Sequence, residues 1–252
     1  MIIKALKKVA DILQALKDLG LSKMLELRKD GVHYARYQIF NKKWIVNYNI
    51  NCVLDIGANV GEFALIFHHL FNSPNIHCFE PLPECIEILN KTTKDKDNIT
   101  IHPYALGLIN SKEILHVSSH GPSSSIMPMG ELHKAAYPHS ADSKDIEIEC
   151  RVLDEVFKPT EINDNLLIKI DVQGFERNVI KGGEGVFSRA KIVVIEMSLQ
   201  ELYENEAQFD ELYSLLINLG FVYRGSLKQS VNKIDDGFLQ CDGIFVNEKS
   251  GI

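Results

Sequence analysis

Short apolar runs alternate with amphipathic stretches along residues 50–247, a pattern typical of strands and helices that follow one another in an α/β domain. The first run, at Val53, Leu54 and Ile56, is rich in branched residues and predicts a strand that is covered on both faces. From Glu62 onward, apolar residues recur at helical spacing. Further strands are predicted at 76–79, 99–102, 166–170 and 192–195, helices at 84–91 and 208–219, and a last pair of strands at 221–225 and 239–247.

Residues 1–49 are predicted to form a helical segment that precedes this domain. An apolar stripe along residues 1–19 has alternating spacings of four and three, which predicts a helix that ends at Gly20; a second helix is predicted over 34–47. Lysines interrupt the stripe, so it is neither a signal peptide nor a transmembrane span. It would pack on the domain, join a second subunit in a homo-oligomer, or lie on a membrane surface. The stripe consists of Ile2, Leu6, Val9, Leu13 and Leu16.

We assign the domain to residues 50–252, and within it residues 108–152 differ from the rest in hydrophobic pattern and composition. Alternating polar and apolar residues predict two strands, at 114–117 and 146–150, which flank a stretch rich in serine, glycine, proline and histidine. We interpret this insertion as a substrate lid, because long loops within a compact domain usually serve a function. Ser123, Ser124 and Ser125 are candidate substrate-binding hydroxyls, and His133 is a candidate base that titrates near neutral pH.

A tight glycine turn follows the first predicted strand. Gly57 lets the backbone turn without a Cβ, and Gly61 lets the next helix pack closely or a ligand approach the main chain. Asp55, at the carboxyl end of the strand, would repel a pyrophosphate and attract a cation. Glu80 follows the second strand, roughly 20 residues after the turn, where an acid can bind ribose hydroxyls. A ligand with a ribose, no phosphate and a positive end is S-adenosylmethionine.

The same residues carry a family resemblance. The runs Asp55-Ile-Gly-Ala-Asn-Val-Gly61 and Phe79-Glu-Pro81 resemble the FkbM-type S-adenosylmethionine-dependent methyltransferase family. Gln173 departs from the glutamate that much of that family carries, so no catalytic role is transferred to this position. Similar blocks follow in the family's order over about residues 50 to 246: Ala105-Leu-Gly107, Ser123-Ser-Ser125, Leu153-Asp154, Ile168-Lys-Ile-Asp-Val-Gln-Gly174 with Glu176, and Leu239-Gln-Cys-Asp-Gly-Ile-Phe245.

The resemblance implies a Rossmann-like class I methyltransferase fold, with a seven-stranded and mostly parallel sheet, an antiparallel last strand and helices on both faces, here preceded by N-terminal helices. It also implies an O-methyltransferase whose acceptor is a hydroxyl of a sugar, glycan or natural product. The residues implied to meet the cofactor are Asp55, Gly57, Ala58, Asn59, Gly61, Glu80, Pro81, Tyr104, Ala105 and Asp171.

Two acids, Asp171 and Glu196, stand at neighbouring strand ends. In one mechanism His133 or Asp171 takes the proton of the acceptor hydroxyl, and Glu196 orients the base. In the other, Asp171 and Glu196 share a divalent ion such as Mg²⁺, by analogy with the metal-dependent catechol-type methyltransferases. Lys169 lies on the same face of its strand as Asp171, which predicts a buried lysine paired with a carboxylate. Asp242 is a further candidate substrate-binding residue, with a turn or a strand-end hydrogen bond as its structural alternative.

Composition narrows the class of protein. The net charge of −7 and the pI near 5.7 disfavour a nucleic-acid partner. Five scattered cysteines without a Cys-x-x-Cys pair predict neither a disulfide frame nor a zinc site, and they fit a reducing, cytoplasmic compartment. A nicotinamide-dependent oxidoreductase is disfavoured by Asp55 and by the missing Gly-x-Gly-x-x-Gly spacing. The remaining alternative is a catalytically silent methyltransferase-like binding protein, against which the joint presence of Asp55, Glu80, Asp171 and Glu196 argues.

Overall fold

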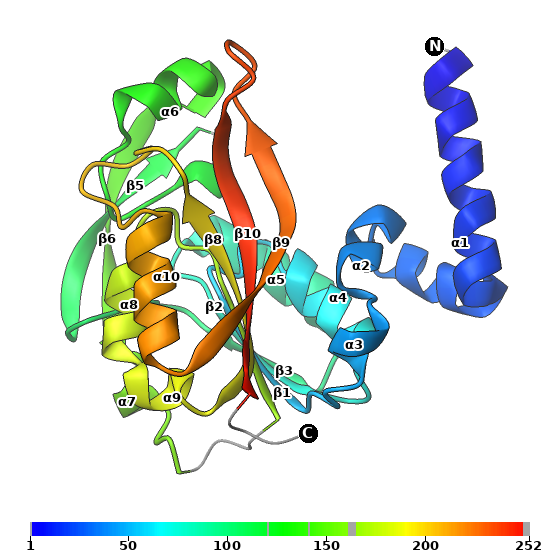
Figure 1. The fold of residues 1–252 in the computed structure, drawn as a ribbon, viewed down its shortest axis with the longest axis horizontal. Helices are drawn as coiled ribbons and strands as arrows, with labels where there is room; N and C mark the ends of the chain where they lie inside the picture. Colours follow the sequence, from blue (N-terminus) through cyan, green and yellow to red (C-terminus); the bar gives the residue numbers. More distant parts are fainter. Residues whose placement is uncertain (1, 120, 141, 161–164, 249–252) are drawn as a thin grey trace.

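The computed structural model describes residues 2–119, 121–140, 142–160 and 165–248, with the side chains of residues 2–13 left out of the description. Seven strands form one sheet in the order β3-β2-β1-β7-β8-β10-β9 (Figure 1). Strands β3, β2, β1, β7 and β8 are parallel, whereas β10 runs antiparallel to both of its neighbours, which confirms the predicted fold class. The strands are β1 (Cys52–Ile56), β2 (Asn75–Phe79), β3 (Ile99–His102), β7 (Leu166–Ile170), β8 (Ala190–Ser198), β9 (Phe221–Val231) and β10 (Phe238–Asn247).

Helices cover both faces of this sheet, because successive side chains of a buried strand point to opposite sides. In β1, Val53 packs into the apolar cluster beneath helix α4, while Leu54 and Ile56 pack into the cluster beneath helices α8 and α10. All three side chains are at most 1% exposed, and burying each contributes roughly 1.5–3 kcal/mol. One face carries α4 (Glu62–Leu70) and α5 (Pro83–Thr93), and the other carries α7 (Leu153–Val156), α8 (Glu176–Gly182), α9 (Glu184–Phe187) and α10 (Phe209–Asn218).

The N-terminal segment is helical but more broken than the sequence predicts. Helix α1 (Ile2–Lys29) is interrupted at Gly20, where φ is 75° and ψ is 166°, and the helix then resumes. The single helix predicted over 34–47 is two short ones, α2 (Tyr34–Phe40) and α3 (Lys43–Val46). The first part of α1 extends away from the domain (Figure 1), and most of the predicted apolar stripe falls on side chains outside those described. Among the helices described, none combines the length and the apolar character that a membrane crossing requires.

The insertion forms a small sheet of its own, in the order β4-β6-β5. The two strands predicted there are confirmed as parts of β5 (Ser111–Ser118) and β6 (Ser143–Val152), which are longer than expected. Strand β4 (Ala105–Gly107) was not predicted, because three residues are too few to show a period. Between β5 and β6 lie the 3₁₀ turns η1 (Gly121–Ser123) and η2 (Pro138–Ser140) and helix α6 (Glu131–Ala136).

Candidate active site

A cavity of about 520 Å³ opens at the carboxyl ends of β1, β2, β7 and β8, beneath the insertion. Its volume lies within the range of small-molecule sites in proteins. Of the sequence-predicted site residues, the cavity wall includes Gly57, Ala58, Asn59, Glu80, Pro81, Ala105, Asp171 and Glu196, together with Ser123, Ser124, Ser125, His133 and Asp242. Asp55, Gly61 and Tyr104 do not line it.

Both predicted glycines have positive φ, but they serve different contacts. Gly57 has φ 77°, and a Cβ there would collide with the backbone carbonyl of Asp171. Gly57 therefore lets the ends of β1 and β7 approach each other at the floor of the cavity. Gly61 has φ 88°, and a Cβ there would collide with Leu89 of α5. Of the two roles that the sequence offered for Gly61, the structure supports close helix packing.

Glu80 is held rigidly beside the glycine turn. Its Oε2 accepts the backbone N–H of Asn59 at 2.8 Å, and its Oε1 accepts the backbone N–H of Leu82 at 2.9 Å. The side chain is buried, and burial raises the pKa of its carboxyl while the two backbone hydrogen bonds oppose the shift. Each carboxylate oxygen can accept a second hydrogen bond, so the group remains able to bind ribose hydroxyls in the cavity.

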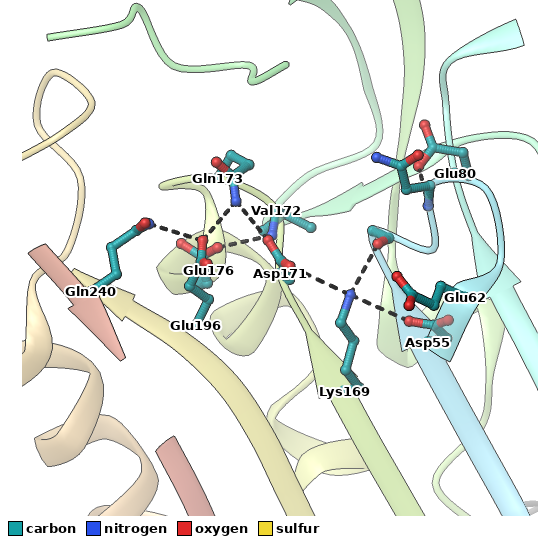
Figure 2. A network of polar contacts seen from close by, with 12 residues as sticks. Asp55, Glu62, Glu80, Lys169, Asp171, Val172, Gln173, Glu176, Glu196 and Gln240 are labelled. Atoms are coloured by element: carbon teal, nitrogen blue, oxygen red, sulfur yellow. Dashed lines mark hydrogen bonds and ion pairs between the residues drawn. The ribbon is translucent and has the colours of Figure 1, made fainter. Parts of the chain in front are cut away.

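Asp55 meets a cation of the protein itself. The carboxylate is fully buried, and its Oδ1 lies 3.4 Å from Nζ of Lys169, which donates to the Gly57 carbonyl at 3.0 Å (Figure 2). Lys169 Nζ also lies 3.7 Å from Asp171 Oδ2. Burial alone would lower the pKa of Lys169, but the nearby acids outweigh it and raise the pKa. Asp55 thus holds Lys169 and the glycine turn in place, which confirms the predicted lysine–carboxylate pair and gives Asp55 an indirect role.

Asp171 and Glu196 form a pair joined by one amide. Gln173 Nε2 donates to Asp171 Oδ1 at 2.7 Å and to Glu196 Oε2 at 2.6 Å, and Gln240 donates to the same Glu196 oxygen at 2.9 Å (Figure 2). Burial raises the pKa of Glu196 well above its usual value, and the charges of Asp171 and Asp242 add to this. Burial, followed by the charge of Asp171, raises the pKa of Asp242 to about 6. The carboxyls of Glu196 and Asp242 therefore hold protons more tightly than isolated carboxyls do.

The buried carboxyl group of Glu176 holds the loop after β7 through two backbone hydrogen bonds. Glu176 accepts the backbone N–H of Val172 at 2.9 Å and that of Gly174 at 3.0 Å, and burial raises the pKa of its carboxyl to about 8. Gln173 and Gly174 both have positive φ, of 54° and 97°, so the loop bends sharply between the two bonds. This bend places the Gln173 side chain between the acids.

Two serines of the insertion use their hydroxyls in contacts within the protein, and one of these contacts, from Ser125, reaches the loop after β7. Ser125 Oγ donates to the Gln173 carbonyl at 2.5 Å and accepts the backbone N–H of Met127 at 2.9 Å. Ser124 Oγ donates to the Gly121 carbonyl at 2.8 Å and accepts the backbone N–H of Ser118 at 3.1 Å. The hydroxyls of Ser124 and Ser125, expected to bind substrate, thus have protein partners already.

His133 and Tyr203 meet inside the wall. The His133 ring is 3% exposed, and its Nε2 lies 3.3 Å from the Tyr203 hydroxyl while its Nδ1 lies 3.3 Å from the Ser140 hydroxyl. The Tyr203 hydroxyl donates to Gln173 Oε1 at 2.8 Å and to the Ser123 carbonyl at 3.1 Å. Sequence reasoning missed Tyr203, because it lies in an irregular segment after β8 where no period marks a buried residue.

The carboxylates of Asp171 and Glu196 are not arranged to bind the divalent ion that analogy suggested. The Gln173 amide donates to both carboxylates and so lies where a shared cation would have to bind. Within the described residues there is no group of three or more His, Cys, Asp or Glu side chains placed to hold a metal. We therefore derive no step through a metal.

Tyr104, implied by the resemblance to meet the cofactor, lies outside the cavity wall. Its ring packs under the Arg151 guanidinium, whose Cζ is 4.1 Å from the ring centroid, and its hydroxyl lies 3.1 Å from His102 Nδ1. Its neighbour Ala105 does line the cavity, with the apolar side chains of Leu82, Leu106 and Phe175. The cavity thus combines an apolar wall, an acid at the ribose position and a negatively charged corner, which together fit S-adenosylmethionine.

Strand order, antiparallel final strand and cavity position define a class I, S-adenosylmethionine-dependent methyltransferase. The family model described as "Methyltransferase FkbM domain" matches residues 55–223, and the chain belongs to this family. Four residues of the cavity wall lie outside the matched range: Arg36, Lys228, Gln240 and Asp242. The segments that flank the family domain therefore help to build the site.

Relatives with named activities are distant. The chain is 28% identical over 170 residues to the 2-O-methyltransferase NoeI of Sinorhizobium fredii, a match that covers 65% of this chain and 70% of NoeI. It is 27% identical over 143 residues to the hexuronic acid methyltransferase AglP of Haloferax volcanii, which covers 57% of this chain and 54% of AglP. A crystal structure of methyltransferase FkbM from Methylobacillus flagellatus superposes with a TM-score of 0.49 at 13% identity, over 79% of this chain and 44% of that one. The matched region thus spans about half the length of AglP and less than half of the FkbM chain.

Proposed function

We propose that this chain is an O-methyltransferase that methylates a hydroxyl of a sugar, glycan or natural-product acceptor. The observation that carries the proposal is the shared cavity, which joins Glu80 at the predicted ribose position to the acids Asp171 and Glu196. A cofactor bound beside Glu80 would thus share this cavity with a group able to take a hydroxyl proton. The named activities of NoeI, a 2-O-methyltransferase, and AglP, a hexuronic acid methyltransferase, support this class of acceptor.

Asp171 is the base in this proposal. S-adenosylmethionine, when bound, supplies an electrophilic methyl group, so the protein has to align the acceptor and remove its proton. The Asp171 side chain is 28% exposed and lines the cavity, with Oδ1 held by the Gln173 amide and Oδ2 3.7 Å from the Lys169 ammonium. Both ring nitrogens of His133 instead face protein hydroxyls at 3.3 Å. His133 therefore supports the wall, and Glu196 orients Asp171 through the shared amide.

The proposal is tested in two steps. Isothermal titration with S-adenosylmethionine, S-adenosylhomocysteine and NAD should show binding of the first two alone. Incubation with S-adenosylmethionine and a panel of neutral sugars, uronic acids and glycan fragments, followed by mass spectrometry, should then show a gain of one methyl group on an acceptor oxygen. Cofactor binding without transfer to any acceptor in extracts of the source cell would support a binding protein instead.

A further inference from the structure

The Gln173 side chain lies at the centre of the polar network, and its two ends have different partners. Its Nε2 donates to Asp171 and Glu196, and its Oε1 accepts the Tyr203 hydroxyl. An amide nitrogen can only donate and an amide oxygen can only accept. The Tyr203 O–H therefore determines which end of the amide faces the two acids, and the reversed amide would place three oxygens against one another.

Tyr203 is well placed to orient this amide, because it is itself immobilised. Its side chain is fully buried, and the carboxylate of Glu206 accepts the backbone N–H groups of Leu202 and Tyr203 and, at 2.9 Å, the hydroxyl of Ser198. Burial raises the pKa of the Tyr203 phenol far above its usual range, so the hydroxyl keeps its proton. Of its two acceptors the Gln173 oxygen is the closer, at 2.8 Å against 3.1 Å for the Ser123 carbonyl.

The insertion contacts the same two residues. The Ser123 carbonyl and His133 Nε2 both lie within 3.3 Å of the Tyr203 hydroxyl, and Ser125 Oγ donates to the Gln173 backbone carbonyl. These contacts come from the part of the chain that covers the cavity, whereas Asp171 and Glu196 belong to the strand ends below it. Tyr203 and Gln173 thus connect the cover of the site to its acids.

We propose that Tyr203 and Gln173 are positioning residues, with Tyr203 orienting the Gln173 amide so that the amide holds Asp171 and Glu196 together and favours their ionised forms. The proposal rests on the O-methyltransferase function proposed above. Two carboxylates that accept from one amide nitrogen repel each other when both are ionised, and the N–H groups of that amide offset the repulsion. Other titratable groups of the same cavity wall or acid cluster are Lys169 of β7, Glu176 of α8, Asp242 of β10, Lys228 of β9, Arg36 of α2 and His133 of α6, whereas the hydrogen bonds that reach both acids come from Gln173.

A double-mutant cycle tests this directly. Tyr203→Phe keeps the ring and removes the hydroxyl, and Gln173→Met keeps the length of the side chain and removes the amide. Each should lower kcat about tenfold or more, because one hydrogen bond to a charged group is lost or misdirected. Each should also move the acid limb of the kcat/KM profile to higher pH. If Tyr203 acts through Gln173, the double variant should be no slower than Gln173→Met alone.

A second readout needs neither acceptor nor turnover. Carboxyl ¹³C NMR titration of the Glu196 side chain should show a higher pKa in both single variants than in the unmodified protein. Tyr213→Phe, at a tyrosine on α10 away from the cavity, is the matched control and should change nothing. Additive effects in the cycle, or carboxyl titrations like those of the unmodified protein in both variants, would overturn the proposal. If Tyr203→Phe does not fold, the titration is carried out on Gln173→Met. If the unmodified protein binds no cofactor, that result counts against the proposed O-methyltransferase function and not against the positioning role.

Discussion

At the scale of single residues, the chemistry of Asp171 depends on the groups that hold it. Gln173 donates to one oxygen, and the Lys169 ammonium lies 3.7 Å from the other, so the carboxylate has a fixed orientation at the cavity wall. A positioned general base typically contributes 10²- to 10⁴-fold to the rate. The same contacts explain why Lys169 is structural: its ammonium lies between two carboxylates and a backbone carbonyl.

Asp171→Asn should therefore lower kcat about 10²- to 10⁴-fold and leave the affinity for S-adenosylhomocysteine unchanged. Turnover of the unmodified protein should survive EDTA, because the Gln173 amide lies between the two carboxylates where a metal would have to bind. Asp97→Asn, at an exposed acid in the loop before β3, is the matched control. Steady-state kinetics with His133→Ala alongside separates the two candidate bases. Retained turnover in Asp171→Asn with a large loss in His133→Ala would assign the base to His133.

Glu80→Gln should weaken the binding of S-adenosylhomocysteine about 10- to 100-fold, because a charge-assisted hydrogen bond to a ribose hydroxyl contributes roughly 1.5–3 kcal/mol. Glutamine retains one acceptor oxygen, so the backbone N–H of Asn59 or Leu82 also loses its partner and Tm should fall. Isothermal titration and thermal unfolding measure the two effects separately. Glu87→Gln, on the exposed face of α5, should change neither, and an unchanged Kd in Glu80→Gln would remove Glu80 from the ribose site.

At the scale of elements, the regular parts of the domain were predictable and the irregular ones were not. Strand ends of a parallel sheet converge at one edge, so the sequence could bring Glu80, Asp171 and Glu196 into one cavity. The partner of each residue depends on loop geometry, which has no period. The sequence therefore could not predict that Asp55 lies behind the cavity wall and pairs with Lys169, or that Tyr203 reaches Gln173.

The loop after β7 gives a prediction on stability against pH. Burial raises the pKa of the Glu176 carboxyl from its ordinary value of 4.5 to about 8 in the folded protein. Between these two pH values the folded state holds a proton at this site that the unfolded chain has released. The contribution of Glu176 to stability is therefore largest below pH 4.5 and decreases as pH rises towards about 8.

Glu176→Gln should remove this contribution. Thermal unfolding across the same pH interval should show a smaller fall of Tm with rising pH than in the unmodified protein, although the variant is less stable throughout because an amide oxygen cannot replace both carboxylate acceptors. Glu184→Gln, an acid in the first turn of α9 whose carboxyl has no comparable burial, is the control. Parallel Tm curves for Glu176→Gln and the unmodified protein would contradict the assignment.

At the scale of the whole molecule, the two parts of helix α1 differ in how closely they contact the domain. The second part of α1 is anchored: Leu27 is 2% exposed, and Asp30 Oδ2 lies 2.8 Å from His69 Nε2 of α4 and 2.9 Å from Lys96 Nζ. From α2, Arg36 reaches the cavity wall. The start of α1 instead extends away from the domain (Figure 1), and the described side chains before Gly20 meet the rest of the chain near the end of that part, where Asp18 accepts the Tyr34 hydroxyl and Leu19 packs against the cluster beneath α4.

Deletion of residues 2–13 should therefore leave Tm and the affinity for S-adenosylhomocysteine unchanged, because buried Ala15, the Asp18 and Leu19 contacts, the anchored part of α1 and Arg36 all remain. The deleted stretch carries four of the five residues of the apolar stripe together with Lys4, Lys7 and Lys8, a combination suited to a second subunit or to an anionic membrane surface. We expect the deletion to change either the mass in light scattering or flotation with phosphatidylserine liposomes. Asp30→Ala is the complementary variant: it should lower Tm, since it removes the partner of His69 and Lys96, and should leave association unchanged. If the deleted and full-length proteins match in both association assays, the stripe has neither role.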